Sequence, residues 1–596
     1  MGDKEELYIP ISAGRAETVE SSEARIAPKR LYSGPIVSLE KLAALMAVAM
    51  VITCPRTGLP ISTSLRPTAW FNLLAKYPDR SWSRRLVADI IYGVDIGFRG
   101  SRKTRIDCRN MPLTDEESEA ITQHLAEESA LARLAGPYDQ PPWDHFWCSP
   151  LKTVPKKSST KKFRIVHHLS YPHGNSVNSH TAEWDCYLSH FDDAIEIVRQ
   201  VGRGCFMSKV DIKAAYHCIP VRPADWSVLG MRWEQKYYFH KTLPFGLTTS
   251  CHLWERYSSA AEWILRAEGG VQHITHYVDD FFIADSNKAL LEADLAVVDR
   301  LFLRLGLPVS VRLDPTTTII FLGFEIDSRE LVIRLGDARR KEIAATLRDW
   351  VGRETCSARE LQTLVGILQW ACRVIRHGRT FLQRMYDMLL PHVNSKHPFD
   401  SSAIELENVF QEDLEWWSLF MDKWNGVTLI TDQDWMTEGH PLQPHTDASS
   451  SGYGAVCGRS WFHGQWTGEQ ESWSREATAN RDSMPFKELF AVVTAALTWG
   501  SQWGRKKVVF RVDCLPVVQA VQKGATRQRR MMQLLRALHH CAALHHFDYR
   551  IVHIAGVDNV IADELSRVFS VSQLSQTCRQ LIDPSPVMAA LPLIQE

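Results

Sequence analysis

The sequence predicts a multidomain protein of mixed α and β structure. The chain has 596 residues, more than a single hydrophobic core usually organises. Its residues are 45% hydrophobic and 23% charged, which is typical of a globular protein rather than a disordered one. Short apolar runs typical of strands are interspersed with segments of helical periodicity. Together these observations predict an α+β or α/β protein with several domains.

The N-terminal third begins with a polar segment, residues 1–35, which we predict to be flexible. Residues 36–135 are predicted to be mostly helical. Their most apolar run, Leu42 to Cys54, is about 13 residues long, too short to cross a bilayer. We therefore expect a buried helix there and no membrane association.

The most informative motif is Tyr277-Val278-Asp279-Asp280, which lies between two apolar runs. The pattern predicts a strand, a two-residue turn and a second strand, with both acids at the tip. Two adjacent carboxylates repel each other unless a cation lies nearby, and divalent metal ions prefer carboxylate oxygens. A solvated turn is the alternative interpretation of this motif alone.

A third carboxylate, Asp211, ends an upstream run of β-type residues that starts at Cys205. Alone, such a residue is more often a cap or turn residue than a metal ligand. Together with the hairpin pair it would form a cluster able to hold two Mg²⁺ ions. Nucleotidyl transfer needs that arrangement, with one ion on the attacking oxygen and one on the leaving oxygen.

The order of these motifs resembles that of a reverse transcriptase. The resemblance rests on five segments: 156–166, the Asp211 strand, Leu243 to Ser250, the Tyr277–Asp280 box, and Phe321 to Asp327. It implies a right-hand polymerase with fingers, a ferredoxin-like palm and a helical thumb. It also implies the partners: an RNA or DNA template-primer and dNTPs.

The resemblance assigns a role to each matching residue. Asp211, Asp279 and Asp280 would bind two Mg²⁺ ions, with Mn²⁺ as the alternative ion. The triphosphate and sugar would be held by Lys157, Arg164, Tyr216, Phe245, Gly246 and Tyr277. Tyr216 matches the ring that lies under the deoxyribose and excludes a 2′-hydroxyl. One departure is Arg312, which stands where the family usually has a lysine thought to protonate pyrophosphate.

Four further acids lie near the C-terminus, each beside a predicted strand or helix. Taken singly, Glu488 could stabilise a helix N-terminus and Asp513 could cap one. Together they resemble the active site of ribonuclease H. That resemblance covers Asp447, Glu488, Asp513 and Asp563 as ligands of two Mg²⁺ ions, and His553 as the family's mobile histidine. It implies cleavage of the RNA strand of an RNA–DNA hybrid.

The predicted domains follow from these assignments. They are the flexible segment 1–35, the helical region 36–135, fingers and palm 136–327, thumb 328–392, connection 393–440, ribonuclease H 441–570 and tail 571–596.

Basic residues gather near both predicted sites although the net charge is only −1. One run spans 152–180. The other spans 505–536 and includes Arg527, Arg529 and Arg530, which we predict to contact the phosphate backbone. A solvated basic face is the alternative. The 13 cysteines contain no C-x-x-C spacing, which predicts reduced thiols and an intracellular protein, in the cytoplasm or the nucleus.

Several segments look most like DIRS-type (tyrosine-recombinase) retrotransposon polymerases, among them 135–137, 169–178 and 374–381. A recombinase and Gag-like proteins would then be on separate chains. The predicted function is RNA-directed DNA synthesis with RNase H activity. Two alternatives are a co-opted nucleic-acid-binding protein without turnover, and a nuclease whose polymerase half is inactive. Retention of all seven acids favours the enzyme.

Overall fold

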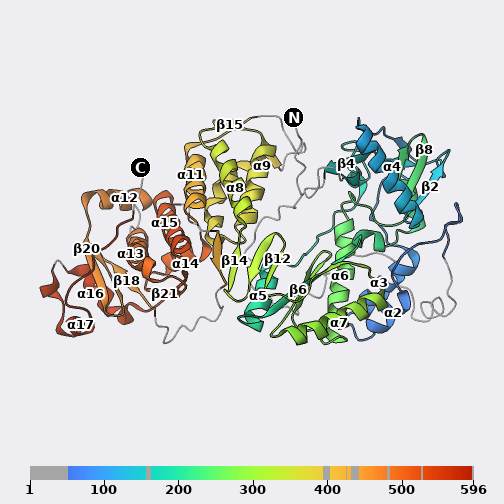
Figure 1. Cartoon of the computed structure of the whole chain (residues 1–596). Helices are drawn as coiled ribbons and strands as arrows, with labels where there is room; N and C mark the ends of the chain where they lie inside the picture. The colour runs from blue at the N-terminus through green and yellow to red at the C-terminus, as the bar shows by residue number, and fades with distance from the viewer. Residues whose placement is uncertain are drawn as a thin grey trace. The chain divides into compact units, whose positions relative to one another are not determined.

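A computed structural model describes residues 52–155, 163–393, 403–424, 426–430, 442–478, 484–524, 526, 528–568 and 570–592 (Figure 1). The chain divides into two compact units, Met1–Ile319 and Ile320–Glu596. The predicted flexible segment 1–35 lies outside the described residues, as do Lys157 and Arg527.

The centre of the first unit is a four-stranded antiparallel sheet. Its strands are β6 (Phe206–Ile212), β9 (Ile274–Tyr277), β10 (Asp280–Asp285) and β11 (Val309–Arg312), in the order β11-β6-β10-β9. The chain between β6 and β9 forms β7 (Gly230–Trp233) and β8 (Lys236–His240) and then helix α6 (Ser250–Ala267), and α7 (Lys288–Leu305) connects β10 to β11. This connection and strand order confirm the predicted ferredoxin-like palm.

Both faces of the palm sheet are covered, which explains why β10 is apolar on consecutive residues rather than alternating. Phe281, Phe282 and Ile283 are all fully buried. Helices α6, α7 and α5 (Phe191–Val201) contact strands of this sheet. A sheet covered on both faces selects continuous hydrophobic strands.

A second sheet in this unit has the order β1-β3-β7-β8-β2. Its strands are β1 (Ile106–Asp107), β2 (Leu134–Tyr138), β3 (Trp147–Cys148), β7 (Gly230–Trp233) and β8 (Lys236–His240). The predicted fingers hairpin consists of β4 (Leu151–Pro155) and β5 (Phe163–His167), which pair antiparallel.

The described part of the predicted helical region, 52–135, contains three helices. They are α2 (Pro67–Leu73), α3 (Arg80–Tyr92) and α4 (Asp115–Ala130). Thr114 and Glu117 form a capping box at the start of α4. Trp70 of α2 is buried and donates through Nε1 to the Leu305 carbonyl oxygen over 3.0 Å, which fixes this region to the palm helix α7.

The second unit begins with a sheet of order β12-β13-β14-β17 and a set of helices. The strands are β12 (Thr318–Phe321), β13 (Phe324–Asp327), β14 (Val332–Arg334) and β17 (Val427–Leu429). The helices are α8 (Asp337–Trp350), α9 (Ala358–Ala371), α10 (Gln383–Val393) and α11 (Asn408–Lys423), with β15 (Thr355–Cys356) paired to β16 (Ile404–Glu405).

The two compact units divide between Ile319 and Ile320, whereas we predicted domain boundaries after residues 327 and 392. β13 pairs with β14, and β14 pairs with β17, so residues 324–327 belong with the second unit. The predicted thumb and connection share this sheet, and α11 packs on α8. β14 and β17 pair although they are far apart in the sequence. The composition of the chain does not reveal such long-range pairing.

The remaining sheet has the order β20-β19-β18-β21-β22. The strands are β18 (His445–Ala448), β19 (Gly452–Cys457), β20 (Ser460–Gln465), β21 (Lys507–Val512) and β22 (Asp548–His553). The helices are α12 (Gly468–Thr478), α13 (Met484–Trp499), α14 (Leu515–Lys523), α15 (Arg529–His545) and α16 (Val560–Arg567). β18 to β20 pair antiparallel, whereas β18, β21 and β22 pair in parallel. The whole chain therefore has the predicted mixed α/β class.

Residues 570–592 are packed on this sheet rather than forming a separate tail. Leu574, Ile582 and Cys578 of α17 (Gln576–Leu581) are buried in one cluster with Trp461. Trp461 donates through Nε1 to the Asp583 carbonyl oxygen over 2.9 Å. The packed structure therefore continues past residue 570, where we predicted the ribonuclease H domain to end.

No helix in the described ranges combines the length and apolar character needed to cross a bilayer.

Candidate active sites

The first candidate site is at the tip of the β9–β10 hairpin. Val278 and Asp279 form the turn, and Val278 has φ of 56°, a left-handed conformation that is uncommon for a β-branched residue. Two side chains of α6 hold this turn: Trp254 Nε1 and Ser258 Oγ donate to the Val278 carbonyl oxygen over 2.8 and 2.6 Å. Neither was predicted as a site residue, because their role depends on a tertiary contact.

The palm sheet brings Asp211 to the same place as the hairpin acids. Asp211 is directly opposite Asp280 in the β6–β10 register, and the amide of Ile212 donates to the Asp279 carbonyl oxygen over 3.1 Å. Ser310 Oγ, on β11, donates a hydrogen bond to Asp211 Oδ2. The three predicted carboxylates therefore lie together at the same end of the paired strands β6 and β10.

The electrostatics of this end of the strands favour a cation. Burial, together with the negative charge of Asp211, raises the pKa of Asp279 to about 6. Burial also raises the pKa of Asp280, and Asp211 adds to the rise. The positive charge of Arg164 acts on Asp279 in the opposite direction. A carboxyl group whose ionised form is disfavoured in this way is stabilised by a bound cation, so the residues present fit a divalent metal ion.

The predicted nucleotide pocket is next to these acids. The rings of Tyr216 and Phe245 lie 5.1 Å apart between centroids. Gly246 has φ of 100°, and a Cβ there would lie 2.1 Å from the His167 carbonyl oxygen, so a larger residue does not fit. Asn178 Nδ2 donates to the Gly246 carbonyl oxygen over 2.8 Å. Asn178 thus positions the pocket loop, a role that sequence reasoning missed.

Two other predictions concern cations near this site. Arg164 is on β5 and is close enough to influence the pKa of Asp279, as a triphosphate-binding residue should be. Arg312 forms an ion pair with Asp299 of α7, with Nη1 and Oδ2 2.5 Å apart. Its guanidinium is therefore paired with a carboxylate of a palm helix. Tyr277 ends β9 and is half-buried.

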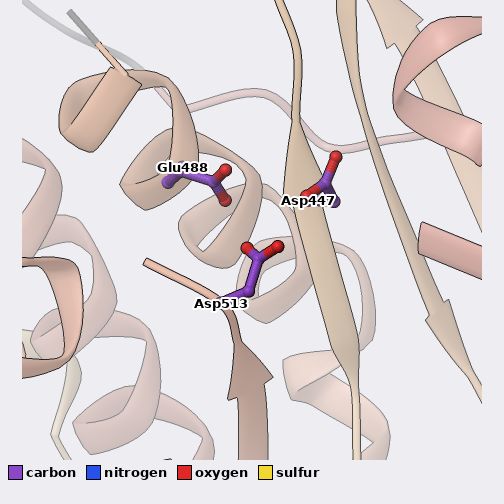
Figure 2. Close-up of side chains that lie close together, drawn as sticks. All are labelled: Asp447, Glu488 and Asp513. Atoms are coloured by element: carbon purple, nitrogen blue, oxygen red, sulfur yellow. The ribbon is translucent and has the colours of Figure 1, made fainter. Parts of the chain in front are cut away.

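The second candidate site joins three carboxylates from three elements, β18, α13 and the end of β21. Oxygens of Asp447, Glu488 and Asp513 all lie within 4.8 Å of one another. Figure 2 shows the three side chains directed toward a common point. Strand β18 is central in its sheet and parallel to β21, so the carboxyl ends of both strands meet at this edge.

Burial of these carboxylates is the main cause of large pKa shifts. Burial, then the charges of Asp447 and Asp513, raise the pKa of Glu488 to about 9. Burial raises the pKa of Asp447 to about 6. Asp447 Oδ2 and Glu488 Oε2 are buried without a hydrogen-bond partner. Buried oxygens of this kind fit a divalent cation, which would supply their missing positive partner.

The other two predicted residues border this cluster. The negative charge of Asp563 raises the pKa values of Asp447, Glu488 and Asp513. Asp563 is not one of the three acids whose oxygens converge. It forms an ion pair with Arg567, with Oδ1 and Nη2 2.5 Å apart. His553 Nε2 lies 3.2 Å from the Asp513 carbonyl oxygen and is exposed. Arg567, one helical turn after Asp563, had no predicted role.

Two of the predicted backbone-binding arginines, Arg529 and Arg530, lie among the described residues, and both form ion pairs within the protein. Arg529 Nη2 lies 3.2 Å from Glu412 Oε1, and Arg530 Nε lies 2.7 Å from Glu476 Oε2. The Arg530 side chain is only 12% exposed, whereas that of Arg529 is 59% exposed. A phosphate contact by Arg530 would require loss of its ion pair, so Arg529 is the better placed of the two.

Comparison with known families matches residues 154–326 to the family described as Reverse transcriptase (RNA-dependent DNA polymerase). The chain is 24% identical over 362 residues to the Gag-Pro-Pol polyprotein of Simian retrovirus SRV-2, covering 59% of this chain and 18% of that protein. It is 25% identical over 188 residues to Protein P of Duck hepatitis B virus (strain United States/DHBV-16), covering 31% and 22%. The chain thus matches about a fifth of the length of each relative.

Among solved structures, the foamy viral protease-reverse transcriptase dRH in complex with double-stranded DNA aligns with a TM-score of 0.44 and 15% identity, over 83% of this chain and 84% of that one. The foamy viral protease-reverse transcriptase in complex with an RNA/DNA hybrid aligns with a TM-score of 0.42 and 14% identity, over 89% and 67%. The family match contains the whole palm with Asp211, Asp279 and Asp280. Residues 154–326 are therefore a reverse transcriptase domain related to those of retroviral polyproteins.

Proposed function

We propose that this chain is an RNA-directed DNA polymerase that also degrades the RNA strand of the hybrid it makes. The observation that carries the proposal is the meeting of Asp211, Asp279 and Asp280 at one end of the paired strands of a ferredoxin-like palm, inside the range that matches the reverse transcriptase family. The substrates would be a template-primer and dNTPs. Mg²⁺, with Mn²⁺ as the alternative, is proposed as the cofactor.

At the polymerase site the divalent ions would activate the primer 3′-hydroxyl and neutralise the leaving pyrophosphate. Asp211 and Asp279 would hold them, with Asp280 beside them. Arg164 would contact the triphosphate, which a guanidinium can do through two hydrogen bonds. Tyr216 and Phe245 would bound the sugar, and Gly246 lets the backbone approach the nucleotide closely.

At the second site we propose the ribonuclease H reaction. Asp447, Glu488 and Asp513 would bind one ion, and Asp563 would complete the set for a second. The exposed ring of His553, beside the Asp513 carbonyl, would transfer a proton or assist product release. The unpartnered carboxylate oxygens support a metal-dependent nuclease over a structural role for this cluster.

The finer assignments are also proposals. Residues 135–137, 169–178 and 374–381 support a DIRS-type retroelement as the origin, with a recombinase and Gag-like proteins on other chains. Lys157, Arg527, Arg529 and Arg530 are proposed to contact phosphates. The proposed domains are fingers and palm 136–327, thumb 328–392, connection 393–440 and ribonuclease H 441–570.

The test uses one substitution in each site. Asp279→Asn should abolish dNTP incorporation on poly(rA)/oligo(dT), because a neutral amide cannot hold the two metal ions. Cleavage of RNA in a hybrid should remain intact. Asp513→Asn should have the opposite effects. Loss of about three orders of magnitude corresponds to roughly 4 kcal/mol of transition-state stabilisation.

The outcomes separate the proposal from its alternatives. Incorporation by the Asp279→Asn protein at the rate of the unmodified chain would refute the polymerase assignment. Hybrid cleavage without any incorporation would identify a nuclease with an inactive polymerase half. Binding of template-primer with neither activity would identify a co-opted nucleic-acid-binding protein.

A further inference from the structure

Two cysteine thiols lie together beside the nucleotide pocket. Cys251 is in the first turn of α6, and Cys186 is in the irregular segment between Thr181 and α5. Their sulfur atoms are 3.8 Å apart. Both residues are half-buried. The predicted reduced thiols therefore include one pair close enough to react together.

Residues on either side of Cys186 contact His252, in the first turn of α6. His252 Nδ1 lies 2.8 Å from the Asp185 carbonyl oxygen, and the rings of Trp184 and His252 lie 5.2 Å between centroids. The next residue, Tyr187, is 80% exposed. A disulfide needs the sulfurs about 2 Å apart. An irregular surface segment can supply this small movement more easily than a helix can.

The thiol pair is connected to the pocket through Tyr216. Tyr216 lies close enough to Cys251 to lower the pKa of its thiol, and the Tyr216 ring packs against Phe245, a proposed pocket residue. Cys186 donates its S–H to the Cys251 sulfur, which lowers the pKa of the Cys251 thiol. A helix N-terminus also favours a thiolate. Cys251 is therefore the sulfur that would react first with an oxidant.

We propose that Cys186 and Cys251 are a reversible oxidation site, and that their disulfide alters nucleotide binding by removing the Cys251 contact with Tyr216. The oxidant class is a peroxide. The Cys251 thiolate attacks one peroxide oxygen, the O–O bond breaks, and a sulfenic acid and one water form after proton transfer. The Cys186 sulfur then attacks the Cys251 sulfur, the S–O bond breaks, and a second water leaves. The thiols lose two electrons and the peroxide gains them.

The chemical test does not depend on enzymatic activity. The reduced full chain is treated with hydrogen peroxide, remaining thiols are alkylated with N-ethylmaleimide, and the protein is digested without reductant for mass spectrometry. We expect a peptide pair joining Cys186 to Cys251 that dithiothreitol separates. Cys186→Ser should not form it, whereas Cys457→Ser, which changes a half-buried thiol of the second unit, should. Recovery of both residues only as separate alkylated or over-oxidised thiols would overturn the proposal.

The effect on the pocket rests on the proposed polymerase function and is tested in two ways. Peroxide should raise KM for dNTP by about tenfold, reversibly, in the unmodified chain and not in Cys186→Ser. Hydrogen exchange of residues 212–219 should increase when the disulfide forms. If the reduced chain incorporates no dNTP, the proposed polymerase function fails. The hydrogen-exchange measurement then tests by itself whether the disulfide affects the residues around Tyr216. A linked peptide with unchanged exchange over residues 212–219 would refute the coupling to Tyr216.

Discussion

At the residue scale, the two acidic clusters place like charges in buried positions, which opposes folding until a cation binds. Burial, then the charges of Asp447 and Asp513, raise the pKa of Glu488 from its ordinary value of 4.5 to about 9. The folded chain therefore holds a proton on Glu488 that the unfolded chain has lost at pH 7. Stability without metal is highest below pH 4.5 for this group and falls as pH rises toward 9.

Glu488→Gln should therefore stabilise the metal-free protein at pH 7, by up to about 3 kcal/mol, because the amide needs no proton. The gain should shrink at pH 5. Mg²⁺ should raise the melting temperature of the unmodified chain and have a much smaller effect on the variant, which has lost one ligand. Thermal unfolding with and without Mg²⁺, at both pH values, measures this. Equal Mg²⁺ stabilisation of the two proteins would remove Glu488 from the metal site.

Tyr216 offers a second prediction at this scale. Its ring packs against Phe245, so truncation opens space beside the proposed position of the sugar. Tyr216→Ala should increase kcat/KM for rNTPs relative to dNTPs by at least about tenfold, a change of roughly 1.4 kcal/mol in selectivity. Tyr216→Phe keeps the ring and is the matched control. An unchanged ratio in the alanine variant would exclude the steric role.

At the scale of elements, α11 and α15 are joined by a charged contact within the second unit. Arg536 Nη2 lies 2.7 Å from Asp413 Oδ1, and the two side chains are 10% and 1% exposed. Arg384 Nη1 lies 2.9 Å from Glu412 Oε2 in the same group. Trp416 of α11 also donates through Nε1 to His540 Nδ1 of α15 over 3.1 Å. These contacts link the region predicted as connection to the proposed nuclease.

Arg536→Met should destabilise the second unit by about 3–5 kcal/mol, because it leaves the Asp413 carboxylate buried without its partner. Burial already raises the pKa of Asp413 to about 7, so the penalty should be smaller at pH 5, where the carboxyl group is protonated. The double variant Arg536→Met with Asp413→Leu should recover most of the loss. Urea unfolding of both variants at pH 5 and 7.5 measures the effect. Additive losses in the double variant would show that the pair does not interact.

At the scale of the whole molecule, the first unit contains three buried histidines that stay neutral. Burial lowers the pKa of His167 to about 4 and that of His217 to about 3, and it lowers the pKa of His240 well below its usual value. Their rings are neighbours, with centroids 5.3 Å apart for His167 and His240 and 5.9 Å for His217 and His240. A proton on any one of them would lie close to the other two.

The unfolded chain binds these protons below about pH 6.5, whereas the folded chain does not, so stability should fall as pH drops from 6.5 toward 4. Uptake of three protons on unfolding gives the free energy of unfolding a slope of up to about 4 kcal/mol per pH unit. Carboxyl groups with a raised pKa, such as Asp279, act in the opposite direction and reduce this slope. His240→Leu should reduce this slope by the contribution of one proton, about a third of the total. Denaturant unfolding between pH 4.5 and 7.5 measures both proteins. The same slope in both would show that His240 does not titrate as inferred.

Local sequence was sufficient for much of this protein. The Tyr277–Asp280 motif predicted a hairpin with acids at its tip, and the hairpin is there, because two apolar runs and the two-residue turn between them are determined by neighbouring residues. The acids Asp447, Glu488 and Asp513 were also predicted as one group and lie within 4.8 Å. In each case the chemistry depends on a few charged residues that lie in or beside a predicted strand or helix.

Tertiary structure alone decided the rest. β17 pairs with β14 across about a hundred residues, and Leu574, Cys578 and Ile582 pack in one cluster with Trp461. The support of the hairpin turn by Trp254 and Ser258, the contact of Asn178 with Gly246, and the thiol pair Cys186–Cys251 are also long-range. Such contacts depend on how distant segments pack. A single sequence carries no local pattern that specifies them, whereas strand and turn patterns are specified by residues a few positions apart.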